Sequence, residues 1–317
     1  MWQSRVKMAG WWTTAVVVLL TVGAVLGQEP TLEDYLNMRV DDQSEEHGQL
    51  AGLKPTNCSC GWTNKARIVG GRRALANEFP LMAGLKAKGH KGVFCGGFVV
   101  TIGHVITAAH CTYPLRSLRK IKLVVVVGEH DQSEKNGNKQ HLAVLKTIEH
   151  ERFNPVTFFN DISIVVLKKH MTFNQLIGPA CLPSGPIELV NEQVKVLGWG
   201  RLSAARVSSD VLMKLNLRVI PLQMCKEKFK RVIDVDSPTQ ICTVRKNKDS
   251  CEGDSGGPLI WLDPETNRYT VVAIVSYGKT LCGTAPAVNT DVSVHLNWIQ
   301  QKISATYPEL MTCSKIE

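Results

Sequence analysis

One stretch, Asp249 to Pro258 (DSCEGDSGGP), concentrates residue types that could perform chemistry. Ser255 lies in it between an acid and two glycines, and its hydroxyl is the candidate nucleophile. A serine hydroxyl is a weak nucleophile near neutral pH, so it needs a base within hydrogen-bond reach and backbone N–H groups directed at the oxyanion. A Gly-Asp-Ser-Gly run by itself is also typical of an ordinary turn. The stretch therefore predicts a nucleophile only if the rest of the chain supplies the base.

Among the nine histidines, His110 is the best candidate for that base. It follows Thr-Ala-Ala and precedes Cys111, so its small neighbours leave room around the ring and a disulfide could fix the loop. A histidine packed into the core is the alternative. Asp161 precedes an apolar run, and a buried carboxylate there needs a partner such as an imidazole N–H. Asp161 is thus the candidate that orients His110.

Residues 65–71 (KARIVGG) indicate a processing site. Cutting after Arg67 would free the amine of Ile68, and a buried amine is costly unless a carboxylate meets it. Asp254, beside the candidate nucleophile, is the expected partner. The alternative is an ordinary basic loop followed by a strand.

Folded elements must position these candidate residues. The chain has 317 residues and 44% hydrophobic content, which is enough for one large hydrophobic core or two smaller ones. Arg5 and Lys7 precede an apolar run that ends near Gly27, which predicts a signal peptide over residues 1–27. An uncleaved anchor is the alternative. Residues 28–67 begin as a polar, acidic segment without periodicity, so we expect a pro-segment or linker with no core of its own.

Ten cysteines on the secretory route favour disulfides, because the paired spacing of a zinc site is missing. The net charge of +9 is scattered, which favours a solvated surface over a nucleic-acid interface. We therefore expect no metal or cofactor, no nucleic-acid partner, and no membrane contact once the signal is removed.

From residue 68 to the end, short β-rich runs separated by turns predict an all-β domain, and no alternation of strand and helix supports an α/β sheet. The apolar spacing of residues 292–303 predicts a terminal amphipathic helix. The expected strands lie within residues 79–87, 93–101, 104–109, 121–129, 141–150, 161–169, 193–200, 215–220, 258–262, 269–278 and 287–292.

The segments RIVGG, TAAHC, NDISIVVL and CEGDSGGPL occur in the order and approximate spacing of the trypsin-like serine proteases, a resemblance that covers residues 68 to about 302. The resemblance implies two six-stranded antiparallel β-barrels with the active site between them, and a peptidase domain over residues 68–317. It also implies a His110, Asp161 and Ser255 triad, with the N–H groups of Gly253 and Ser255 as the oxyanion hole.

The resemblance places four residues at the substrate-binding pocket. Asp249 matches the carboxylate at its floor, which implies protein substrates with Arg or Lys before the cut bond. Ser276 matches the serine that helps hold the triad aspartate, and Gly278 lies on the same edge. Ala287 stands where a wall glycine is usual and would narrow the pocket. A surface acid is the alternative reading of Asp249.

Disulfides follow from matched positions in the family. They pair Cys95 with Cys111, Cys225 with Cys242, and Cys251 with Cys282. Cys181 matches a cysteine that tethers the pro-segment, and its partner is Cys60 or Cys58. The remaining one of those two would pair with Cys313.

The chain departs from ordinary trypsins at Lys139, which replaces a calcium-binding carboxylate, so we expect no calcium requirement. The short cysteine-bearing pro-segment resembles arthropod extracellular or venom-type serine proteases. Activation would come from another trypsin-like protease or from the chain itself, and the resemblance allows serpin-type or other protein inhibitors as partners. The rival function is a catalytically silent homologue that acts as a binding or cascade scaffold.

Overall fold

The computed structural model describes residues 30–40, 51–64, 74, 76–118, 121–134, 139–200, 209–229, 233–246, 253–278 and 285–317. Five residues with predicted roles lie outside these ranges, namely Arg67, Ile68, Asp249, Cys251 and Cys282.

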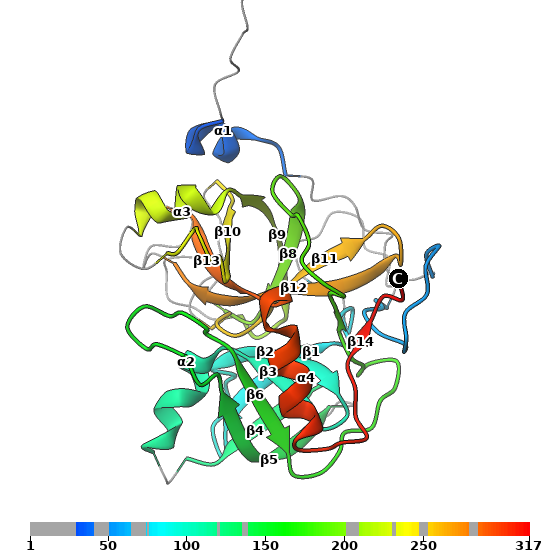
Figure 1. Ribbon diagram of the computed structural model, residues 1–317. Helices are drawn as coiled ribbons and strands as arrows, with labels where there is room; N and C mark the ends of the chain where they lie inside the picture. The colour runs from blue at the N-terminus through cyan, green and yellow to red at the C-terminus, as the bar shows by residue number, and fades with distance from the viewer. Residues whose placement is uncertain are drawn as a thin grey trace, which may run out of the picture.

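The first half of the chain forms a closed six-stranded antiparallel barrel in the order β1-β2-β3-β6-β5-β4 (Figure 1). Its strands are rich in valine and isoleucine, which favour extended backbone and pack well on a pleated surface. They are β1 (Met82–Ala87), β2 (Cys95–Thr101), β3 (His104–Thr107), β4 (Leu123–Val127), β5 (Gln140–Glu149) and β6 (Ser163–Leu167).

The second half forms another six-stranded antiparallel barrel, because β11 pairs with both β8 and β12 and so closes the ring. Its strands are β8 (Gln193–Gly198), β9 (Met213–Ile220), β10 (Gln240–Val244), β11 (Pro258–Asp263), β12 (Arg268–Tyr277) and β13 (Ala287–Asp291). The predicted pair of six-stranded barrels is confirmed.

Two short strands extend the second barrel by parallel pairing. They are β7 (Cys181–Leu182), which pairs with β12, and β14 (Cys313–Ser314), which pairs with β7. Through them the end of the chain lies against the second barrel, where Figure 1 marks the C-terminus.

Helices are few. The predicted terminal helix is confirmed as η2 and α4, and α4 lies alongside the first barrel in Figure 1. The helical elements are α1 (Leu32–Asn37), α2 (Ala109–Thr112), η1 (Tyr113–Arg116), α3 (Leu222–Lys228), η2 (Ser293–His295) and α4 (Leu296–Ser304). In the described part of the chain, no helix has the length and apolar character needed to cross a membrane.

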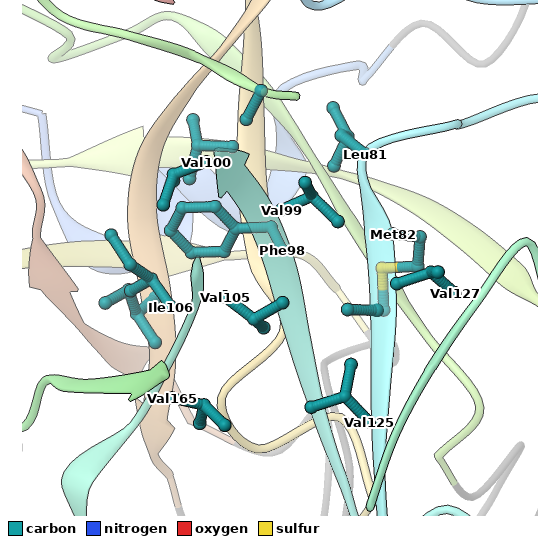
Figure 2. Packing of buried hydrophobic residues seen from close by; sticks show 14 of the residues in the cluster. Leu81, Met82, Phe98, Val99, Val100, Val105, Ile106, Val125, Val127 and Val165 are labelled. Atoms are coloured by element: carbon teal, nitrogen blue, oxygen red, sulfur yellow. The ribbon is translucent and has the colours of Figure 1, made fainter. Parts of the chain in front are cut away.

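Apolar side chains fill the first barrel, as Figure 2 shows. The ring of Phe98 on β2 points toward Ile106 on β3, and both side chains are fully buried. Full burial of a Phe or Ile side chain contributes about 1.5 to 3 kcal/mol, so this packing fixes the strands from which the loops of the site emerge.

The segment before residue 55 was expected to be a pro-segment or linker without a core of its own, and its first part packs against the second barrel. Residues 32–37 form helix α1, and Tyr35 is only 4% exposed. The helix has fewer than two turns, and only Leu32, Tyr35 and Leu36 form its apolar face. So few residues give no clear helical periodicity in the sequence.

Candidate active site

His110 and Asp161 are hydrogen-bonded through two contacts. The ring nitrogen Nδ1 of His110 lies 2.7 Å from Oδ2 of Asp161, and the backbone N–H of His110 donates to Oδ1 at 2.8 Å. The Asp161 side chain is fully buried, whereas that of His110 remains 21% exposed. When Nδ1 donates its hydrogen to the carboxylate, Nε2 keeps a lone pair and can accept a proton.

Two more side chains fix Asp161. The hydroxyl of Ser276, on β12, donates to its Oδ2 at 2.5 Å, and the hydroxyl of Thr290, on β13, donates to its backbone carbonyl at 3.0 Å. A fully buried carboxylate needs hydrogen-bond partners of this kind. The sequence prediction for Ser276 as a partner of Asp161 agrees with this geometry.

Ser255 lies in a turn that touches both barrels. Its carbonyl accepts a hydrogen bond from the N–H of Gly96 on β2 at 2.8 Å. The next residue, Gly256, donates its N–H to the carbonyl of Val275 on β12 at 2.9 Å. Gly256 has a φ of 76°, and a Cβ there would meet the hydroxyl of Thr107 at 2.1 Å, so only glycine fits.

The disulfide between Cys95 and Cys111 joins the His110 loop to the strand whose Gly96 holds the turn of Ser255. Cys95 precedes Gly96, whose N–H holds the turn of Ser255, and Cys111 follows His110. The sulfur of Cys111 also lies 3.7 Å from the carbonyl oxygen of Ser255. Both barrels therefore contribute to a single site.

The side chains of Cys95, His110 and Cys111 lie close enough together to hold a metal ion. Both sulfurs belong to the disulfide, so neither can become the thiolate that zinc binding requires. This cluster is better described as the support of the His110 loop than as a metal site.

The carboxylate of Asp254 lies at the end of β8. Its Oδ1 accepts the N–H of Gly200 at 2.8 Å. A Cβ on Gly198 would lie 2.0 Å from this oxygen, and a Cβ on Gly200 would lie 2.5 Å from it. The two glycines therefore leave the space that the carboxylate occupies.

Aromatic side chains border the His110 side of the site. The ring of Phe158 lies 5.4 Å from that of His110 and 5.6 Å from that of Tyr277 at the end of β12. Phe158 has a φ of 59°, which is uncommon outside glycine and indicates that the loop is held in a fixed shape. Burial raises the pKa of Tyr277 to about 12, so its phenol is uncharged at neutral pH.

The predicted pocket residues are partly described. Gly278 follows Tyr277, and Ala287 begins β13, where the neighbouring Val288 pairs with Tyr277. Ala287 is buried, with 2% of its surface exposed. Asp249, the predicted floor of the pocket, lies outside the described residues.

The eight cysteines in the described ranges form four disulfides. Two of them, Cys95–Cys111 and Cys225–Cys242, agree with the sequence prediction. The two remaining bonds decide the alternative that the sequence left open: Cys60 pairs with Cys181, and Cys58 pairs with Cys313. The predicted Cys251–Cys282 bond falls outside the described residues.

In the sequence analysis, Lys139 replaces a carboxylate that binds calcium in ordinary trypsins. Its ammonium lies 2.9 Å and 3.0 Å from the two carboxylate oxygens of Glu129 and 2.6 Å from the carbonyl of Glu134. A lysine cation therefore binds the oxygens that would otherwise attract a metal ion.

Gly96 and Thr290 also belong to the site, although sequence reasoning missed them. A Cβ on Gly96 would approach Cα of Gly257 to 2.8 Å, so the Gly-Gly pair after Cys95 was an available signal of close backbone approach. Thr290 lies on an ordinary strand pattern, and no feature of the sequence distinguishes it.

Comparison with known proteins shows the family of this chain. The family model described as Trypsin matches residues 68–299. A venom serine protease of Polistes dominula is 36% identical over 264 residues, which are 81% of this chain and 93% of that protein. Trypsin-1 of Astacus astacus is 34% identical over 236 residues, covering 74% of this chain and 98% of the crayfish protein.

Venom serine protease 34 of Apis mellifera is 36% identical over 253 residues. The match covers 77% of this chain but only 60% of the bee protein, so the chain spans less than two thirds of that relative. From the family match and these relatives, the chain belongs to the trypsin family and is a serine-type endopeptidase.

Proposed function

We propose that this chain is a secreted zymogen that, once activated, hydrolyses peptide bonds after Arg or Lys with a triad of His110, Asp161 and Ser255. The observation that carries the proposal is the 2.7 Å contact between Nδ1 of His110 and the buried carboxylate of Asp161. A partly exposed histidine held in this tautomer by a buried acid is prepared to act as a base.

The proposed reaction begins with Ser255. Nε2 of His110 removes the hydroxyl proton while Oγ attacks the carbonyl carbon of the substrate. His110 then gives this proton to the leaving amine, and an acyl-enzyme remains on Ser255. A water molecule, deprotonated by His110 in the same way, releases the acid product. Throughout, Asp161 stabilises the imidazolium and is not itself protonated.

The N–H groups of Gly253 and Ser255 are assigned to the oxyanion. Gly253 has a φ of 101°, a conformation that L side chains rarely adopt, and a Cβ there would meet Cα of Gly200 at 2.9 Å. Glycine at this position thus lets the peptide unit face the reacting carbonyl. Loss of one such donor costs about 100-fold to 1000-fold in rate.

Specificity is assigned to Asp249 together with Ser276, Gly278 and Ala287. A carboxylate in a narrow pocket favours a basic side chain, because a neutral or acidic residue would leave it unpaired. Amide substrates that end in Arg, Lys or Phe test this assignment, and equal rates for all three would refute it.

Activation is assigned to cleavage after Arg67, which separates a pro-segment over residues 28–67 from the domain over residues 68–317. The new amine of Ile68 would bind Asp254, whose carboxylate lies turned toward Gly198 and Gly200. Arg67 itself fits the proposed specificity, so the chain or another trypsin-like protease can perform the cut. Secretion through the signal at residues 1–27 agrees with relatives named as venom proteases.

Fluorophosphonate labelling tests the proposal directly. The chain cleaved at Arg67 should react at Ser255, whereas the Arg67→Gln chain, which cannot be cleaved there, should react far more slowly. Ser255→Ala is the control for labelling at other positions. A cleaved wild-type chain without label on Ser255 would instead support the catalytically silent scaffold.

A further inference from the structure

Helix α1 is a feature that the proposed chemistry does not use. It is only six residues long, and a helix this short is not stable in water by itself. Its start is well defined, because Thr31 and Asp34 form a reciprocal capping box in which the N–H of Thr31 donates to Asp34 Oδ2 at 2.8 Å. The rest of its stability must come from packing.

That packing is against the second barrel, at the end marked by α3, β9 and β10 in Figure 1. Tyr35 is 4% exposed, and Leu32 and Leu36 pack beside it. These three side chains belong to one hydrophobic cluster with residues of the second half of the chain, which we call the Tyr35 cluster. Among its other residues are Ile220, Cys225, Phe229, Ile233, Tyr277 and Val288.

Two basic side chains fix the far end of α1. The ammonium of Lys246 donates to the side-chain carbonyl of Asn37 at 2.8 Å, and the guanidinium of Arg218 donates to the backbone carbonyl of Arg39 at 2.8 Å. Arg218 also donates to the carbonyl of Asn191 at 2.7 Å, so it joins α1 to the loop before β8. The helix is thus held by an apolar anchor and by polar contacts at its end.

Residues 51–64 hold this part of the chain to the second barrel independently of Arg67. The Cys60–Cys181 and Cys58–Cys313 disulfides join the segment to β7 and β14. Backbone bonds support them, including Tyr269 N–H to the Gly61 carbonyl at 2.9 Å. A cut after Arg67 therefore leaves the segment before it covalently attached, and α1 can stay in place in the activated enzyme.

The Tyr35 cluster also borders the proposed substrate edge. Val288 follows Ala287 on β13, and Tyr277 follows Ser276, whose hydroxyl bonds to Asp161. Tyr277 and Phe229 lie 5.4 Å apart, and Phe158 connects Tyr277 to His110. Lys246, the partner of Asn37, precedes Asp249 by three residues in the sequence.

We propose that residues 31–39 are a retained intramolecular brace, with Tyr35 as its anchor, that docks in cis on the second barrel and positions the substrate-binding edge of the activated enzyme. This role rests on the proposed peptidase function. Tyr35 shares one hydrophobic cluster with Tyr277 and Val288 and is not a member of the triad, so its role here is that of a positioning residue.

The test uses the full chain with a foreign protease site inserted between Glu45 and Glu46. After activation at Arg67, a cut at the inserted site leaves the brace attached only by non-covalent contacts, and gel filtration removes it. We expect KM for an Arg-ended peptide amide to rise about 5-fold or more, the lower end of typical coupling between linked sites. We expect the rate at which a small fluorophosphonate labels Ser255 to stay within about 2-fold, because the triad is unchanged.

A synthetic peptide of residues 30–40 should then restore the original KM in a saturable way. The same peptide with Tyr35→Ala should require an about 10-fold higher concentration to restore KM, because a buried aromatic anchor dominates such binding. In the uncut chain, Tyr35→Ala should raise KM, whereas Leu53→Ala should not, since Leu53 is 97% exposed in the same segment.

An unchanged KM after removal of the brace, or binding of the peptide without any change in KM, would overturn the inference. So would an uncut Tyr35→Ala enzyme with wild-type KM and wild-type thermal stability. Failure of the proposed function is a separate result, because Ser255 would then remain unlabelled both with and without the brace.

Discussion

The N–H of Gly96, on the first barrel, donates a hydrogen bond of 2.8 Å to the carbonyl of Ser255, on the second. Gly96 follows Cys95, whose disulfide partner Cys111 follows His110. The proposed base and nucleophile are therefore fixed relative to each other by one hydrogen bond and one covalent bond. Because the hydrogen bond crosses between the barrels while the disulfide lies within the first, small shifts in barrel packing should affect catalysis before they affect the fold of either barrel.

Substitution of the triad aspartate should lower activity without unfolding the protein. Asp161→Asn keeps the shape of the side chain but favours the wrong tautomer of His110, and this change costs about 10,000-fold in kcat for such triads. Ser276→Ala removes only one donor to Asp161 and should cost much less. Steady-state kinetics with an Arg-ended amide measure both, and near-normal kcat for Asp161→Asn would contradict the assigned role.

Gly198→Ala should impair the active conformation. Its new methyl would lie 2.0 Å from Oδ1 of Asp254, so either β8 or the Asp254 carboxylate must move. Gly185→Ala is the matched control, because a Cβ there meets no atom within 4 Å. We expect a large loss of kcat/KM and a lower Tm for Gly198→Ala only. If the two variants have equal kcat/KM and equal Tm, the Asp254 carboxylate can move without loss of activity or stability.

Lys139 should determine the response to calcium. Its ammonium neutralises Glu129, whose side chain is 2% exposed, so Lys139→Ala should lower Tm by leaving a buried carboxylate unpaired. Lys139→Glu should behave differently, since it adds a carboxylate to an oxygen-rich loop and calcium prefers such ligands. We expect its Tm to rise with added calcium and to fall with a chelator. A wild-type Tm that responds in the same way would contradict this interpretation of Lys139.

Buried His104 should make stability fall in acid. Burial, with a smaller effect of nearby His170, lowers the pKa of His104 to about 4 from its ordinary value of 6.5, while Glu309 opposes the shift. Between these pH values the unfolded chain binds the proton and the folded chain does not, so stability is full above pH 6.5 and declines toward pH 4. Denaturant unfolding of wild type and His104→Asn measures this.

The variant should be less stable at pH 7, because His104 bonds to the hydroxyls of Thr101 and Thr306 at 2.8 Å and 2.6 Å. Its unfolding free energy should nevertheless change less between pH 7 and pH 4 than that of the wild type. If the unfolding free energies of the two proteins change equally with pH, the acid sensitivity comes from other groups. One such group is His150, because burial also lowers its pKa to about 4.

The amino-acid sequence by itself determined the order of His110, Asp161 and Ser255, the all-β class and the terminal helix. These signals are local, since each depends on residue type within a few positions and on strand or helix periodicity. The close contact of the two barrels at Gly96 and Ser255 is not local. Residues more than a hundred positions apart meet there only after both barrels close.

Only the tertiary structure decided how Cys58 and Cys60 pair, because cysteine spacing allows several connectivities and the position of β7 and β14 selects one. It also decided that Tyr35 is buried. A six-residue helix has too little periodicity to stand out in an acidic segment, and its stability depends on a surface provided by strands far along the chain. Local chemistry could thus be predicted from the sequence, whereas contacts that form only by burial could not.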